Sequence, residues 1–182
     1  GIPSPTIEDL TGTLGIDSLD VSGTGVNNLN PVLKFKNLNY LAFDDNEIID
    51  LLPLAEMKTI EIISGKNTKI KDLEPLVGMT DLTSIDFRDS PVTGFIMLKS
   101  LPKLSYLNLD NSEIDPASIP EFLLSNPKIN IIYRSALLEQ WWVAIEDSWK
   151  TAFKKAYGNG DSEPDLETLH RWTAMPSLKV EN

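Results

Sequence analysis

The side chains of this chain that could do chemistry are mostly carboxylates. Adjacent Asp44 and Asp45, together with Asp86, Asp89 and Asp110, are oxygen ligands of the kind that a hard cation such as Ca²⁺ prefers. Paired carboxylates are also the catalytic groups of many glycoside hydrolases. Both interpretations require that the fold bring several of these side chains to one site.

The chain lacks the residues that other kinds of catalytic site require. The only histidine, His170, has no serine nearby and no metal-ligand spacing, so a catalytic triad or a histidine metal site is not supported. The chain has no cysteine, which excludes disulfides, thiolate metal sites and cysteine nucleophiles. The sequence therefore predicts no enzyme, no cofactor and no metal-binding residues.

The carboxylates and the residues around them belong to a sequence pattern that repeats every 22 residues. From Ile16 onward an apolar residue returns every 22 positions, followed three and five places later by further apolar residues, such as Leu19 and Val21. This spacing indicates short strands, and two later apolar series keep the same phase. The starts are Ile16, Leu38, Ile60, Leu82 and Leu104, and the later series are Val26, Ile48, Ile70, Val92, Ile114 and Leu29, Leu51, Leu73, Phe95.

One residue of the third unit departs from the apolar pattern, and a polar position recurs with the same 22-residue period. Gly65 stands where the third unit should be apolar, although its neighbours hold register. In the polar position a small side chain recurs, and we expect it to hydrogen-bond backbone groups left open where the chain leaves the strand. The residues in this position are Thr24, Asn46, Thr68, Ser90 and Ser112.

Repetition at this period in the form L-x-x-L-x-L-x-x-N-x-L is the mark of leucine-rich repeats. The proline-containing returning segments 30–32, 51–54 and 73–76 resemble the 22-residue repeats of the bacterial internalins and other SDS22-like proteins, and the resemblance covers residues 16–135. It implies an α/β fold, a right-handed solenoid with a concave parallel β-sheet and short 3₁₀ or irregular turns on the convex side. It also implies a concave sheet that binds another macromolecule.

Equivalent residues of adjacent turns stand about 4.8 Å apart in a parallel coil, so the outward side chains form rows across the concave sheet. We predict three such rows, from the third, fifth and seventh positions of each unit. The third-position row is Ser18, Tyr40, Ile62, Ser84, Tyr106 and Ile131; the fifth-position row is Asp20, Ala42, Ser64, Asp86, Asn108 and Tyr133; the seventh-position row is Ser22, Asp44, Lys66, Arg88 and Asp110.

These rows favour a binding surface over a cation site. In the seventh-position row two acids flank Lys66 and Arg88, so the carboxylates already have basic neighbours. Exposed tyrosine is typical of protein interfaces, although strand propensity alone also favours Tyr and Ile, and a face that only stacks is the alternative. The predicted partner-binding residues are Tyr40, Ile62, Lys66, Asp86, Arg88, Tyr106, Asn108, Asp110 and Tyr133.

The repeat changes after the fifth strand. We predict a fifth unit of 25 residues, from Leu104 to Ile129, with a longer helical turn inside it and a sixth strand over 129–133. Residues 136–157 predict one amphipathic helix, ended by Gly158, that carries three of the four tryptophans. We expect these tryptophans to cover the open end of the solenoid, with a docking helix for a partner as the alternative.

The end of the chain repeats its beginning. A shift of 159 positions places Pro164 on Pro5 and Leu178 on Leu19. We expect 175–180 to form a seventh strand beside the sixth. Alternatively this segment opens another repeat array or extends the sheet of a neighbouring molecule. The predicted organisation is an N-terminal helical cap over 1–15, the solenoid of about six strands over 16–135, and capping helices with a terminal strand over 136–182.

The composition and net charge argue against some classes of partner. The chain has 182 residues, of which 24% are charged and 41% hydrophobic, as expected for a folded soluble chain. A net charge of −11 without a basic cluster argues against nucleic acid, and no apolar run approaches the roughly 20 residues of a membrane span. The first residues resemble a trimmed N-terminus, and the internalin resemblance favours an exported, cell-envelope location over a cytoplasmic one.

The sequence as a whole predicts a non-catalytic protein–protein interaction module that binds a macromolecular partner through the concave sheet. The expected partner is a protein, with a glycan as the alternative. The other functional hypothesis is a structural spacer or assembly segment of a larger cell-surface protein, which self-associates through its ends and forms a homo-oligomer through the C-terminal segment.

Overall fold

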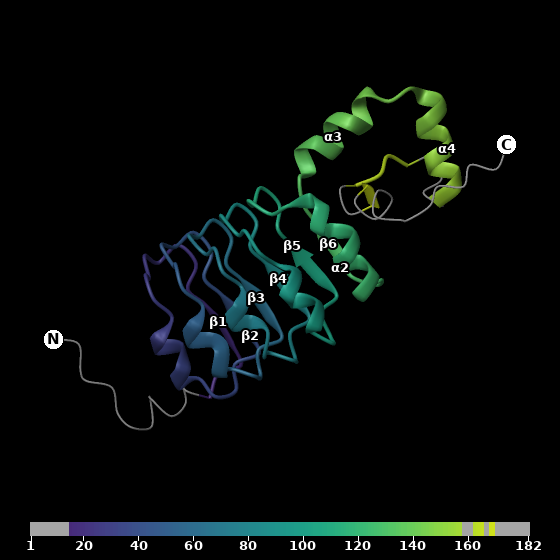
Figure 1. Ribbon diagram of the computed structural model, residues 1–182. Coiled ribbons are helices and arrows are strands. Elements are labelled where there is room, and N and C mark those ends of the chain that lie inside the picture. The colour runs from purple at the N-terminus through teal and green to yellow at the C-terminus, as the bar shows by residue number, and fades with distance from the viewer. Residues whose placement is uncertain (1–14, 158–161, 166–167, 170–182) are drawn as a thin grey trace.

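Six short strands form one open parallel sheet, and they lie in the sheet in the order in which they occur along the chain (Figure 1). The computed structural model describes residues 15–157, 162–165 and 168–169. The strands are β1 (Ser18–Asp20), β2 (Tyr40–Ala42), β3 (Ile62–Ser64), β4 (Ser84–Asp86), β5 (Tyr106–Asn108) and β6 (Asn130–Ile132). This sheet confirms the solenoid that the 22-residue spacing predicts.

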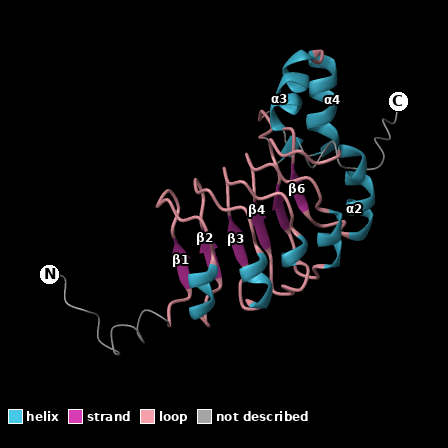
Figure 2. Cartoon of the chain, turned by 60° about the vertical axis from the view of Figure 1, so that its left-hand side comes forward, coloured by secondary structure: helices cyan, strands magenta, loops and turns pink. Residues whose placement is uncertain are grey.

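A 3₁₀ turn follows each of the first five strands and returns the chain on the other side of the coil (Figure 2). Proline lies in the first positions of four of these turns, where its fixed φ suits the turn and its missing N–H costs nothing. Asp50 and Asp72 support two of them by accepting hydrogen bonds from the backbone two residues later. The turns are η1 (Asn30–Lys34), η2 (Leu52–Glu56), η3 (Glu74–Leu76), η4 (Ile96–Ser100) and η5 (Pro116–Ser118).

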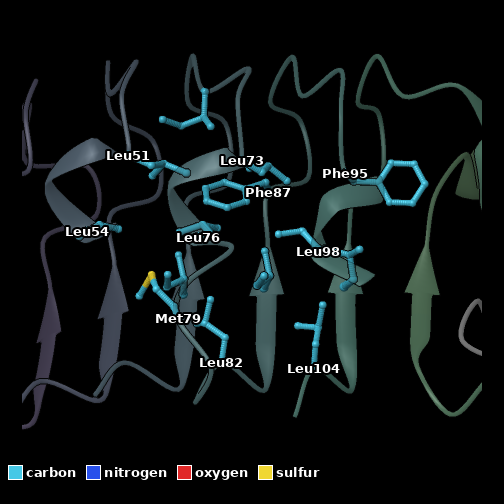
Figure 3. Close-up of a cluster of buried hydrophobic side chains, with 14 of the residues drawn as sticks. Leu51, Leu54, Leu73, Leu76, Met79, Leu82, Phe87, Phe95, Leu98 and Leu104 are labelled. Atoms are coloured by element: carbon cyan, nitrogen blue, oxygen red, sulfur yellow. The ribbon is translucent and has the colours of Figure 1, made fainter. Parts of the chain in front are cut away.

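The inner side chains of the strands form one row through the centre of the coil. Leu19 pairs in register with Leu41, and the same row continues to Leu107. From Leu41 onward the row is fully buried, whereas Leu19 at the end of the coil is partly exposed. Behind the strands, leucines of the returning turns complete this core (Figure 3). Burial of each such side chain stabilises the fold by about 1.5–3 kcal/mol. Because the neighbouring turns provide this burial, the core depends on them.

The recurring polar side chains bond the backbone as expected. Asn46 donates through Nδ2 to the carbonyl of Val21 in the preceding turn at 2.9 Å, and its Oδ1 accepts from the N–H of Gly25 at 2.9 Å. In the third unit the Thr68 hydroxyl donates to the carbonyl of Gly65 at 2.9 Å. These buried side chains satisfy backbone groups that the strands leave open.

Gly65 is explained by two phenylalanines. Phe43 and Phe87 occupy the same position in the turns before and after it, and both are fully buried. A Cβ on Gly65 would lie 2.5 Å from an edge carbon of each ring. The two rings, whose centroids are 6.2 Å apart, therefore fill the space that a side chain of the third unit would occupy.

The fifth unit contains helix α2 (Ile119–Ser125), whose buried Phe122 packs edge-on against Phe95 with centroids 5.1 Å apart. Strand β6 pairs Tyr106 with Asn130, so this unit is 24 residues long and the predicted length of 25 is wrong. The physical reason is Arg134, because the predicted register would place this charged residue in the inner position that Leu109 occupies directly after β5.

Residues 136–157 do not form one helix. The structure has α3 (Ser135–Ala144) and α4 (Asp147–Tyr157), separated at Ile145, whose backbone is extended. In a single helix the rings of Trp142 and Phe153 would lie about 16 Å apart along the axis. The break brings them to 6.4 Å, and it is this aromatic contact that a straight helix could not make.

The tryptophans form a small cluster of their own. Trp142, Phe153 and Leu169 are buried together, and within the described residues this cluster is separate from the solenoid core. The prediction that the tryptophans cover the open end of the coil stays a prediction; in the described residues they pack against one another, and α3 and α4 extend beyond that end (Figure 1). The predicted cap over 1–15, apart from its last residue, and the predicted strand over 175–180 lie outside the described residues.

Replacement of Gly65 by alanine should destabilise the protein by about 1–3 kcal/mol, because the new methyl group overlaps both phenylalanine rings. Chemical unfolding measures this loss. Phe43→Leu in the same chain should recover part of it, since the smaller side chain returns space to residue 65. Gly78→Ala is the matched control: its Cβ meets only the end of the Lys58 side chain, which can move, so a comparable loss there would contradict the packing account.

Candidate functional site

The outward side chains of β2 to β5 form the candidate site on the concave sheet. Because the strands pair in register, Tyr40, Ile62, Ser84 and Tyr106 lie side by side, as predicted. We call this row the apolar row. The fifth-position side chains form the floor row, and the seventh-position side chains form the charged row, kept in line by backbone bonds that continue past the strands. The floor row is Ala42, Ser64, Asp86 and Asn108; the charged row is Asp44, Lys66, Arg88 and Asp110.

The three rows differ in exposure. The floor row is buried, with between 2% and 8% of each residue exposed. Ile62 in the apolar row is 38% exposed, and Tyr40 and Tyr106 are half-buried. Tyr106 also bends over the floor, where its hydroxyl accepts a hydrogen bond from Asn108 Nδ2 at 3.2 Å. The apolar and charged rows are therefore more accessible to solvent than the floor row.

Lys66 is held by the preceding turn. Its Nζ lies 3.0 Å from Asp44 Oδ2, while Asp44 Oδ1 accepts from the Ser64 hydroxyl at 2.7 Å and from the backbone N–H of Lys66 at 2.9 Å. The hydrogen bond to Asp44 raises the pKa of Lys66, and the neighbouring Arg88 opposes this rise. Lys66 is thus a fixed cation in the middle of the face.

Arg88 pairs within its own turn. Its Nη2 lies 2.6 Å from Asp86 Oδ2, and its Nε donates to both carboxylate oxygens at 3.2 Å. This contact raises the pKa of Arg88. The predicted neighbour Asp110 instead accepts the backbone N–H of Ser135 at 2.7 Å and so positions the first turn of α3. Asp86, which the sequence suggests as a contact residue, is a buried support for Arg88.

The sixth strand is placed differently from the prediction. Ile131 and Tyr133 were expected in the outward rows, but Ile131 pairs beside Leu107 and is 3% exposed, and Tyr133 packs partly buried against the same core. Burial raises the pKa of the Tyr133 phenol. The outward residues of β6 are Asn130 and Ile132, which sequence reasoning missed because it took the wrong register.

The exposed carboxylates have a structural use. Asp45 and Asp89 have positive φ values of 55° and 60°, and Asn67 and Asn111 continue the same left-handed position at 22-residue spacing. Asn and Asp tolerate this conformation better than other side chains with a Cβ. Each Asp accepts a hydrogen bond from the Asn of the next turn, at 2.9 Å and 2.8 Å. The sequence signal for this row of left-handed residues is the 22-residue spacing of Gly23, Asp45, Asn67, Asp89 and Asn111.

Two further findings concern chemistry and membranes. Within the described ranges, no group of three or more histidine, cysteine, aspartate or glutamate side chains is placed to hold a metal ion. None of the helices in these ranges combines the length and apolar character needed to cross a bilayer. His170 lies outside the described residues.

Comparison with known proteins supports the fold. No protein-family model and no curated protein sequence matches the chain. Among solved structures it is similar to internalin C2 of Listeria monocytogenes, with 26% identity and a TM-score of 0.62 over 70% of this chain and 56% of that one. Internalin F of the same species follows, with 23% identity and a TM-score of 0.61 over 70% of this chain and 37% of that one. The chain thus spans only part of the length of either internalin.

A third similar structure is the SNF/U2A′ complex of Drosophila melanogaster. It shares 14% identity and a TM-score of 0.53 with this chain, over 74% of this chain and 85% of that one. At this identity the likeness concerns the fold alone. The chain thus shares the leucine-rich repeat solenoid fold with these structures.

The alkaline stability of the protein should depend on Tyr133. Because burial raises the pKa of this phenol above its value of 10.0 in the unfolded chain, the unfolded state ionises first as the pH rises. The stability that Tyr133 contributes is present below pH 10 and is lost as the pH rises through the folded-state pKa. Tyr133→Phe has no such group, so its free energy of unfolding should decline less above pH 10. Parallel pH profiles for the two proteins would contradict this placement.

Proposed function

From the leucine-rich repeat fold that this chain shares with the internalins, we propose that it is a non-catalytic interaction module that binds a macromolecular partner through the concave sheet. The observation that carries the proposal is that Tyr40, Ile62 and Tyr106 of the apolar row are partly exposed on an open sheet. They lie beside the fixed charges of Lys66 and Arg88. Such a mixture of aromatic area and charge is typical of protein interfaces.

The arrangement of the face favours binding because its side chains are already ordered. Lys66 and Arg88 are each held by a carboxylate, and Tyr106 is held by Asn108, so a partner would not have to immobilise them. Preorganisation of this kind lowers the entropic cost of association. The proposed contact residues are Tyr40, Ile62, Lys66, Arg88, Tyr106 and Asp110, with Asp86 and Asn108 as their supports.

The partner that this face suits is a protein, with a glycan as the less favoured class. Resemblance to the internalins is the reason for proposing an exported, cell-envelope location. Fractionation of the source cells tests the location: recovery in the cytoplasm would contradict it.

Replacement of Tyr40 and Tyr106 together by alanine should weaken partner binding at least tenfold, because buried aromatic side chains contribute about 1–4 kcal/mol each at interface centres. Pull-downs from cognate extracts, followed by titration of the recovered partner, measure the effect. Ile49→Ala is the matched control, since Ile49 is 68% exposed but lies outside the strands. Undiminished binding by the double variant, with its fold intact, would show that the partner uses another surface.

A specific observation supports the second candidate, a spacer or assembly segment. Leu137, Val143 and Trp149 on α3 and α4 are 54%, 76% and 49% exposed, and they lie beyond the last turn of the coil (Figure 1). Apolar surface of this kind at one end of a molecule favours self-association.

Sedimentation at increasing concentration separates the two functions. A self-associating spacer should gain mass with concentration and lose this gain when residues 160–182 are deleted. An interaction module should remain a monomer both with and without residues 160–182. Self-association that persists after Leu137→Ser and Val143→Ser would exclude these exposed side chains as the contact.

A further inference from the structure

The first strand of the coil has one open edge. β1 stands at the end of the strand order, and no strand of the described residues pairs with its outer side (Figure 2). Toward β2, the carbonyl of Asp17 accepts hydrogen bonds and the N–H of Val21 donates to the carbonyl of Ala42. Because alternate residues of a strand direct their backbone groups to opposite sides, Ser18 and Asp20 direct theirs to the open edge. This edge can therefore accept one more parallel strand.

The side chains at this end of the coil are only partly covered. Leu19 and Val21 belong to inner rows that are buried in the later turns, yet both are partly exposed here. Asp20 is exposed in the outward fifth position, and within the described residues it forms no salt bridge. Lys66, whose charge acts on Asp20, is paired with Asp44. A strand that completes this edge should therefore carry inner apolar side chains and a cation.

Residues 175–180 have the sequence that this edge requires. They match residues 16–21, with leucine and valine in the inner positions and with Lys179 where the first strand has Asp20. Paired in register, the two strands would place opposite charges side by side, which stabilises a sheet. Beside β6 the same register would place Lys179 next to Ile132, which has no charge. The charges therefore favour β1 as the neighbour.

Pro176 distinguishes the two edges of the sheet by its missing N–H. In the second unit, the N–H of the second residue, Asn39, donates to the carbonyl of Asp17 in the preceding turn at 2.8 Å, and the next three units repeat this bond. Pro176 holds the same position and cannot donate to a preceding turn. Its carbonyl can still accept from a turn that follows. Pro176 thus suits a strand placed before β1 better than one placed after β6.

The distance to β1 decides which molecule supplies the strand. Leu169 is buried with Trp142 of α3, which extends beyond the far end of the coil (Figure 1). From β6 to β1 there are five strand spacings, about 24 Å. The six peptide steps from Leu169 to Met175 span at most about 22 Å. Residues 175–180 therefore cannot reach β1 of their own chain.

We propose that residues 175–180 of one molecule add as a parallel strand to the open edge of β1 in a second copy, with Lys179 beside Asp20. This inference rests on the assembly function proposed above and names its contact. It selects strand addition to a neighbouring molecule over a seventh strand beside β6. Because the contact joins two different surfaces, each molecule keeps one free end, and the copies can continue head to tail.

Exchange of the two charges tests this contact in the full chain. Asp20→Lys and Lys179→Asp each bring like charges together, so each variant should self-associate at least about tenfold more weakly, as measured by sedimentation. An equimolar mixture of the two variants should associate again but stop at a dimer, because only one pairing in the mixture brings opposite charges together. A chain with both substitutions should recover the longer assemblies.

Two further variants control for net charge and for local structure. Glu74→Lys makes the same change of charge at an exposed residue of η3, on the other side of the coil, and should leave self-association within about twofold. Asp20→Asn keeps an acceptor for the N–H of Ser22, to which Asp20 is bonded at 2.9 Å, and should weaken association less than Asp20→Lys. Thermal unfolding verifies that each variant is folded before sedimentation.

The outcomes separate this contact from the assembly function. Association that tolerates both single charge variants, or a mixture of them that stays monomeric, would overturn the strand addition while assembly through another surface stands. A native chain that remains a monomer at every concentration would contradict both. That result is the one expected if residues 1–14 cover β1 or if residues 175–180 pair with β6 of their own chain.

Discussion

The parallel backbone ladder between successive turns is the interaction on which the rest of this structure depends. Each strand is only three residues long, so no turn has a sheet or a core of its own. Hydrogen bonds from one turn to the next hold equivalent residues side by side, and the leucines and isoleucines behind them become one buried column. Any change that moves one turn out of register therefore affects both the core and the outer face.

The same constraint creates the chemistry of the concave sheet. Residues separated by 22 positions become neighbours, and this brings Lys66 against Asp44 and places Arg88 beside Lys66. It also aligns the left-handed Asp and Asn residues at the end of each strand, whose side chains bond from turn to turn. Carboxylates that suggest a cation site when the sequence is inspected locally are thus distributed among ion pairs and turn supports. The side chains that stay partly accessible on the concave sheet are those of the apolar row and the charged row.

Prediction succeeded where the period was regular. The rows from β1 to β5 follow from counting, because every unit before Leu104 has the same length and alternates inward and outward side chains. It failed where the length changed. The fifth unit, which contains helix α2, is one residue shorter than predicted, and this reverses the facing of Ile131 and Tyr133. The break between α3 and α4 carries no glycine or proline, and it permits the contact between Trp142 and Phe153.

The sequence by itself determined the solenoid, its sheet order and most of the concave face. The reason is that a fixed period assigns each residue to a single position in the stack of turns. Tertiary structure alone decided which partners the charges take, why Gly65 is tolerated and where the tryptophans pack. These outcomes depend on side-chain distances that the period does not specify: Arg88 bonds Asp86 of its own turn rather than Asp110 of the next turn, and two phenylalanine rings occupy the space beside Gly65. Local periodicity contains no information about such distances, since several side chains compete for each contact and the best-packed combination prevails.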